Sequence, residues 1–219
     1  MNTINRTIAR PIIVNKTLRS TYQLLSATLI FSGLMAFLAM QLKLPSFGFL
    51  ITLGGYFGLL YLTTKFRNSA WGILAVFALT GFMGLTLGPI INAYVSYFAN
   101  GTQLVAMAMT STGIIFLSLS FYAIVSQKNF SFLSGFLMSG ILIAFIASLA
   151  NIFFQVPALS LIISSAFVLL MSALILYETS NIIHGGETNY IMATVSLFVA
   201  IYNLFLSLLQ ILGIFSGDE

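Results

Sequence analysis

Glu178 is the residue in this sequence best placed to do chemistry, because its carboxyl group follows directly on the apolar run Ala173–Tyr177. Residues 179–184 can continue the same helix, and Gly185 offers the left-handed conformation that commonly ends one. On this interpretation Glu178 lies six residues, or about 9 Å, inside the end of the helix. We therefore expect it at or just below the membrane boundary.

Two interpretations of Glu178 follow from that position. Burial disfavours the charged form of a carboxyl group, so Glu178 is a candidate proton-responsive or gating group. The alternative is an interfacial glutamate whose side chain reaches out to cytoplasmic water. The residues themselves do not decide between the two.

Three further polar residues lie near or within apolar runs. His184 is expected to be a cation at a helix C-terminus, where the helix dipole favours it, with a sensor or ligand role as the alternative. Glu187, beyond the glycines, is expected to be a solvated loop charge. Asn203 lies within an apolar stretch, where a structural hydrogen bond is the default interpretation and a pore-lining role is the alternative.

No catalytic or cofactor motif accompanies these residues. The chain has one histidine and no cysteine, which excludes a histidine-based zinc site, thiolate metal sites and disulfides. The sequence contains no H-E-x-x-H, G-x-S-x-G or P-loop pattern, and its single aspartate, Asp218, is in the C-terminal tail. We therefore expect neither enzymatic activity nor a cofactor.

The elements that must position these residues are transmembrane helices. Only eight Lys and Arg and four Asp and Glu occur in 219 residues, and 59% of the chain is hydrophobic. Seven apolar runs are long enough to cross a hydrocarbon layer about 30 Å thick. The sequence predicts an all-α polytopic membrane protein, with residues 1–21 as an N-terminal tail and residues 22–219 as one compact seven-helix bundle. The runs are Tyr22–Leu42, Phe47–Thr64, Ala70–Ile91, Leu104–Ser126, Phe132–Phe153, Pro157–Tyr177 and Tyr190–Phe215.

The positions of the basic residues predict the orientation, because cytoplasmic loops are enriched in Lys and Arg. Seven of the eight fall on one side of the seven runs, and only Lys43 falls on the other. We expect a cytoplasmic N-terminus and a periplasmic C-terminus. The charges are not gathered on a folded aqueous surface, which argues against nucleic-acid binding. The seven are Arg6, Arg10, Lys16, Arg19, Lys65, Arg67 and Lys128.

Small residues and one proline mark expected contacts and irregularities of the helices. Pairs of small residues four apart allow close packing in lipid, and we expect them to pack within the chain, leaving the oligomeric state open. Pro89 is expected to kink or end its helix. The tail is expected to be mobile, with a short surface helix around Thr17–Ser26. The pairs are Gly54 and Gly58, Gly84 and Gly88, and Gly135 and Ser139.

Four stretches of the sequence, taken in order, are similar to the Bax inhibitor-1 family, and more narrowly to its bacterial YccA-like branch. The resemblance covers everything after about residue 20. It implies a seven-helix fold with a cytoplasmic N-terminus and an inner-membrane protein that modulates the FtsH protease. The stretches are 80–89 (TGFMGLTLGP), 129–140 (NFSFLSGFLMSG), 177–190 (YETSNIIHGGETNY) and 203–213 (NLFLSLLQILG).

The resemblance also identifies a departure from the family pattern. Glu178 matches an acid that the family carries in the sixth helix, whereas matching Asn203 to the family motif puts Ala200 where a second acid is found. Family members with both acids are associated with a pH-dependent calcium leak, and calcium takes about six to eight oxygen ligands. We therefore favour FtsH modulation within the lipid bilayer. The alternatives are a cation leak gated by Glu178 and lined by Asn203, and a scaffold without transport.

Overall fold

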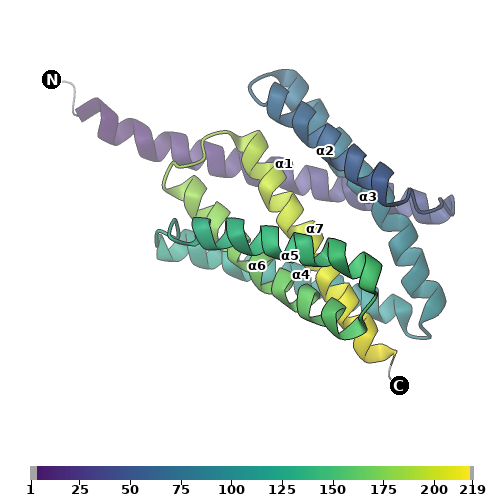
Figure 1. Ribbon diagram of the computed structural model, residues 1–219. Helices are drawn as coiled ribbons and strands as arrows, with labels where there is room; N and C mark the ends of the chain where they lie inside the picture. The colour runs from purple at the N-terminus through teal and green to yellow at the C-terminus, as the bar shows by residue number, and fades with distance from the viewer. Residues whose placement is uncertain (1–3, 218–219) are drawn as a thin grey trace. The chain divides into compact units, whose positions relative to one another are not determined.

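The computed structural model describes residues 4–217, with side chains from residue 16 onward. The described chain is entirely helical, as Figure 1 shows. The predicted all-α fold is therefore confirmed. The helices are α1 (Ile4–Gln41), α2 (Phe49–Phe66), α3 (Ala70–Tyr97), α4 (Gly101–Ser126), α5 (Leu133–Phe154), α6 (Pro157–Ile183) and α7 (Tyr190–Ser216).

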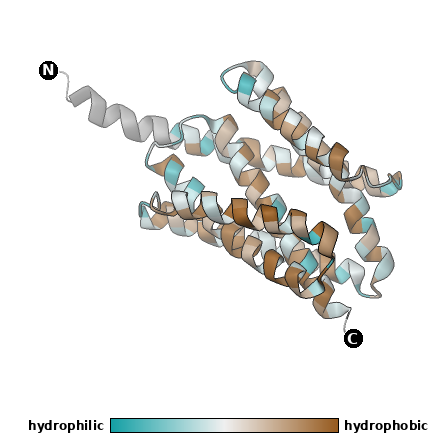
Figure 2. Ribbon diagram, in the orientation of Figure 1, coloured by the Kyte–Doolittle hydropathy of each residue, from teal (hydrophilic) through white to brown (hydrophobic). Residues whose placement is uncertain are grey.

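All seven helices are long and apolar enough to cross a membrane; in α1 the qualifying segment is Lys16–Gln41. Hydrophobic residues run along the helices, and most of the hydrophilic positions gather at the turns (Figure 2). Side chains that are exposed along the helices are largely apolar, as lipid contact requires. The structure thus confirms the seven predicted spans.

Two helices extend beyond the runs from which they were predicted. α3 continues through Pro89 to Tyr97, so the helix does not end there, while the kink that was expected as the other outcome stays a prediction. One proline removes a single backbone donor, which a helix supported by its neighbours tolerates. α1 already begins at Ile4, so the helix expected around Thr17–Ser26 was too short. Residues 12–21 contain neither Gly nor Pro, and nothing local stops the helix there.

The chain divides into two compact units. The first contains residues up to Ser96 and Gly185–Phe198, and the second contains Tyr97–His184 and the residues from Val199 onward. α7 therefore contributes its beginning to the first unit and the rest to the second. The single bundle expected from the sequence stays a prediction.

In the first unit, α1 and α3 approach closely at two glycines of α3. A Cβ atom at Gly84 would collide with the backbone oxygen of Ser32, and one at Gly88 would lie 2.5 Å from the Cβ of Ala39. The expected packing within the chain is confirmed for this pair. The glycines of the other two pairs are Gly54, Gly58 and Gly135. A Cβ atom added at any of them would meet no described atom within 4 Å, so the expected close packing within their own units is wrong for these glycines.

Buried hydroxyl groups bond mainly to their own helices. Thr28 donates to the Leu25 oxygen at 2.9 Å, and Thr86 donates to the Met83 oxygen at 2.7 Å. In the second unit, Thr112 does the same over four residues at 2.7 Å. Each of these hydroxyl groups thus has an acceptor on its own helix, as Ser and Thr commonly do.

The second unit is organised around α6, which packs against both α4 and α5 (Figure 1). Gly140 on α5 makes room for Leu170, whose Cδ2 would lie 2.7 Å from an added Cβ. This packing brings the turns before and after α5 against the two ends of α6.

Candidate functional site

Helix α6 ends as the glycine pair predicted. Its last helical residue is Ile183, His184 is the C-cap, and Gly185 has a φ of 74°. Glu178 is half-buried and lies five residues, about 7.5 Å, before that end. The predicted position of Glu178 near the end of the helix is therefore confirmed, while its proton-responsive role stays a prediction.

Ser180 fastens the loop between α4 and α5 onto α6. Its hydroxyl, 1% exposed, donates to the backbone oxygen of Lys128 at 2.9 Å and accepts from the backbone N–H of Phe130 at 3.1 Å. One hydroxyl thus satisfies two backbone groups of a loop about fifty residues earlier in the chain. No local pattern near either residue indicates this contact, and Ser180 was not among the candidate residues.

His184 contacts its own helix through one ring nitrogen and the end of α4 through the other. Nδ1 lies 2.8 Å from the backbone oxygen of Ser180 and 3.3 Å from its hydroxyl. Nε2 lies 3.1 Å from the backbone oxygen of Gln127, the residue that caps α4. The expected position of His184 at a helix C-terminus is confirmed. Its ring also joins α6 to the end of α4, a contact that the sequence did not predict.

Asn203 forms a hydrogen bond within its own helix. Its side-chain nitrogen donates to the backbone oxygen of Val199 at 2.8 Å, and the residue is half-buried. Ala200, at the position where the family resemblance places a second acid, is fully buried at 0% exposure. Glu178 and Asn203 belong to the same unit, but a gating role for the two remains a prediction.

Carboxylates and other metal ligands do not gather anywhere in residues 4–217. No group of three or more His, Cys, Asp or Glu residues lies together in that range. Calcium takes about six to eight oxygen ligands, usually including carboxylates. The described residues therefore offer no multi-carboxylate cation site.

Asn189 builds a second fastening point, in the first unit. Its side-chain oxygen accepts from the N–H groups of Ile191 and Met192 at 3.0 and 3.1 Å, which caps α7. Its side-chain nitrogen donates to the Arg67 backbone oxygen at 3.0 Å and to the Asn68 side chain at 2.8 Å. The sequence interpretation missed this residue, although an asparagine directly before an apolar helix is a known N-cap signal.

The loop before α7 is also held by side-chain hydrogen bonds. Glu187 is half-buried, and its carboxylate accepts from the backbone N–H of Asn189 at 2.7 Å. Thr17 on α1 donates to the backbone oxygen of Thr188 at 3.4 Å. The expectation that Glu187 is only a solvated charge is therefore wrong, because its carboxylate bonds the turn that caps α7.

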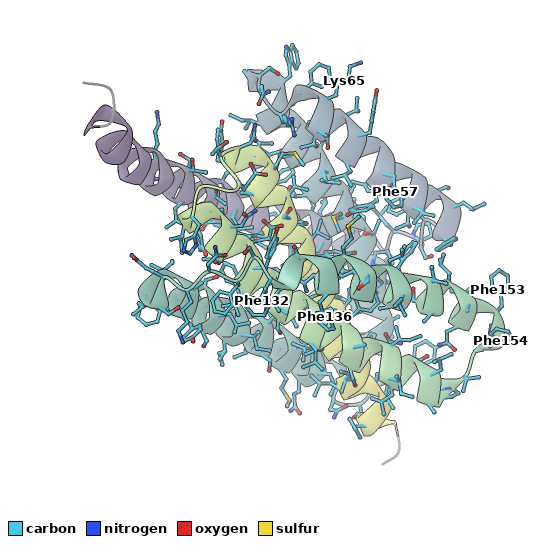
Figure 3. All side chains as sticks on the ribbon, turned by 60° about the vertical axis from the view of Figure 1, so that its left-hand side comes forward. Phe57, Lys65, Phe132, Phe136, Phe153 and Phe154 are labelled. Carbon is cyan, nitrogen blue, oxygen red and sulfur yellow. The ribbon has the colours of Figure 1, made fainter. Side chains whose placement is uncertain are left out.

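The outer face of α5 carries large aromatic side chains at both ends. Phe132 and Phe136 lie at the beginning and Phe153 and Phe154 at the end, and all four project away from the helix (Figure 3). Their exposed fractions range from 63 to 85%. This face is suited to lipid contact, while the opposite side of the helix packs on α6.

Comparison with known proteins places this site in a wider group. A family model described as "Inhibitor of apoptosis-promoting Bax1" matches residues 14–217. The Pseudomonas aeruginosa protein PA2604 is 51% identical over 216 residues, 99% of this chain and 97% of its own length. An Escherichia coli relative named "Modulator of FtsH protease YccA" is 52% identical over 204 residues, 93% of this chain and 92% of its own. A relative in a second E. coli strain, with the same identity and coverage, is named "Inner membrane protein YccA".

Proposed function

Because the chain belongs to the family of inhibitors of apoptosis-promoting Bax1, we propose that it is an inner-membrane regulator that associates with the FtsH protease and modulates it. One observation carries the proposal: 52% identity over more than nine-tenths of both chains to a relative named as a modulator of that protease. The seven apolar helices and the inner-membrane name of a relative support the same location.

The geometry of the candidate site supports regulation more than catalysis. The polar side chains near the ends of α6 and α7 are used to fasten loops: Ser180 and His184 hold the α4–α5 loop, and Asn189 holds the α2–α3 turn. These contacts hold one loop in each of the two units. They do not converge on a point where a substrate atom could react.

We further propose that both of these fastened loops face the cytoplasm. Seven of eight basic residues fall on the side that also holds the N-terminus, and the C-terminus would then be periplasmic. Lys65, Arg67 and Lys128 all lie beside the fastened loops. A protease working from the cytoplasm would meet these loops and the basic start of α1.

A pH-sensitive calcium leak gated by Glu178 is the weaker candidate. Ala200 supplies a buried methyl group where the family resemblance calls for a second carboxylate. Asn203 directs its amide nitrogen to its own helix. A coupled pair of acids, which could share one proton, is therefore missing from these two positions.

Two measurements test the proposal together. Tagged protein is purified from detergent-solubilised membranes, and we expect FtsH to co-purify, unlike with an unrelated multi-pass protein expressed at the same level. Overexpression is expected to slow the turnover of a membrane substrate of FtsH. Absence of FtsH from the purified sample, together with unchanged turnover, would contradict the proposal.

Ion flux into liposomes separates the weaker candidate from the proposal. Purified protein should give no calcium flux above that of empty liposomes between about pH 5 and 8. A flux that is present in the wild type and lost in Glu178→Gln would favour the leak instead.

A further inference from the structure

His184 directs both ring nitrogens at backbone oxygens from two different segments. Nδ1 faces the Ser180 oxygen of α6 at 2.8 Å, and Nε2 faces the Gln127 oxygen at the end of α4 at 3.1 Å. A backbone carbonyl accepts hydrogen bonds and cannot donate one. Each contact is therefore a hydrogen bond only when the facing nitrogen carries a proton.

A neutral imidazole has one N–H group, whereas the imidazolium has two. Only the charged form can make both bonds at once. We propose that His184 is a proton-operated latch: the imidazolium holds the α4–α5 loop against the end of α6, and loss of the Nε2 proton releases Gln127, because Nδ1–H keeps the shorter bond to the Ser180 oxygen. The positive charge also suits the C-terminus of α6, where the unpaired carbonyls carry partial negative charge.

The His184 bond supports a backbone conformation of Gln127 that is unfavourable by itself. Gln127 has a φ of 49°, in the left-handed region that residues other than glycine seldom adopt. Its N–H is bonded to the Ala123 oxygen at 3.1 Å, and its own oxygen is the one that His184 meets. Loss of the His184 bond would remove a contact that offsets the cost of this conformation.

The latch acts on one end of the loop only. The two bonds of the Ser180 hydroxyl to Lys128 and Phe130 involve no group that titrates near neutral pH. Release of Gln127 would therefore loosen the start of the loop while Ser180 still holds its middle. We expect a local change in mobility and not unfolding of the unit.

The charged and titratable groups on the surrounding elements are few. Lys128 extends to the Tyr122 hydroxyl at 3.4 Å, and α5 carries no Asp, Glu, Lys, Arg, His or Tyr. Tyr177 and Glu178 lie on α6, and the following loop holds Glu187, whose carboxylate bonds the Asn189 N–H. Glu178 is thus the other group whose titration could affect this end of α6, and the experiment must separate the two.

The direction of the pH effect follows from the proton count. The latched form binds one more proton than the released form, so acid favours it and rising pH opens it.

The composition of the chain makes the test direct. The single histidine means that protein labelled with ¹⁵N-histidine gives ring signals from His184 alone. The absence of cysteine means that Gln127→Cys, at the exposed start of the loop, accepts one spin label while the backbone oxygen that faces His184 is kept. Ring protonation by NMR and loop mobility by EPR are then followed in nanodiscs from about pH 5 to 8.

We expect both ring nitrogens to be protonated where the label is restricted, and the label to become mobile as one proton is lost. His184→Gln, which cannot titrate, should abolish the pH dependence, whereas Glu178→Gln should retain it. A neutral ring in the restricted state, or unchanged mobility across the titration, would overturn the latch. So would a transition that persists in His184→Gln or disappears in Glu178→Gln. The NMR arm needs no substitution and decides the question even if a variant fails to fold.

Discussion

The turns at the two ends of α5 are both held against α6 by side-chain hydrogen bonds, but different side chains make these bonds. Each adjoining turn begins with a glutamine in the left-handed conformation: Gln127 with φ 49° before α5, and Gln155 with φ 50° after it. Each is fastened by a serine of α6, Ser180 in the first case and Ser160 in the second. The turns differ in the third polar side chain.

At the α5–α6 turn the third group is an amide. Asn151 donates to the Ser160 hydroxyl at 2.6 Å and accepts from the Val156 backbone N–H at 3.1 Å. An amide always has both a donor and an acceptor, and its charge does not change with pH. At the α4–α5 turn the third group is the imidazole of His184. The comparison teaches that the α5–α6 turn is held only by groups that do not titrate, whereas the start of the α4–α5 turn is held by a histidine.

The largest expected effect on the free energy of unfolding comes from replacing the serines of the two turns, Ser180 and Ser160. Ser180→Ala leaves the Lys128 oxygen and the Phe130 N–H without their partner, and should lower the free energy of unfolding by about 2 kcal/mol. Ser160→Ala should cost about 1 kcal/mol or less, because its turn is more exposed to solvent. Unfolding in mixed detergent micelles measures both. Equal losses would show that burial of Ser180 does not set the difference.

A smaller effect is expected when His184 and Asn151, the third polar side chains of the two turns, are replaced, and only the effect at His184 should depend on pH. His184→Gln should destabilise the protein by about 1 kcal/mol in acid, and by less as pH rises, because the wild type then loses its second bond. Asn151→Ala should cost about the same at every pH between 5 and 8. Thermal unfolding at two pH values gives all four differences. A pH-dependent loss in Asn151→Ala would remove the distinction between the turns.

The smallest effect concerns the glutamines themselves. Gln155→Gly should stabilise the protein by about 0.5 kcal/mol, because glycine adopts a positive φ without steric cost. Gln155→Ala keeps that cost and serves as the matched control. Melting temperatures of the two variants and the wild type are compared directly. A gain with alanine as large as that with glycine would attribute the effect to the side chain and not to the backbone.

Local patterns in the sequence predicted the helices and some of their ends. Apolar runs predicted all seven spans, and Gly185 predicted the end of α6 and hence the place of His184. The helix does not end at Pro89, because a local rule for helix breaking does not include the support that α3 receives from α1. The boundary expected at residue 21 stays a prediction, and no local signal interrupts α1 there.

Local sequence patterns could not predict the contacts of the candidate site. Ser180 and Lys128 are separated by 52 residues, and nothing in either neighbourhood indicates the other. The same holds for His184 and Gln127, which are 57 residues apart. Their meeting depends on how α4 packs on α6, which is a property of the folded unit. Asn189 differs, because its capping role was readable from its place before α7.

The hydroxyl groups that bond within their own helices bear on how the protein is assembled. Thr86, Thr112 and Ser165 satisfy their polar groups on carbonyls three or four residues away. Such a helix can enter the bilayer with these groups already compensated, before any neighbour is present. The later association of α1 with α3 then depends on surface shape, and the glycines at 84 and 88 supply that shape. Insertion and association can therefore proceed as separate steps, each governed by its own set of residues.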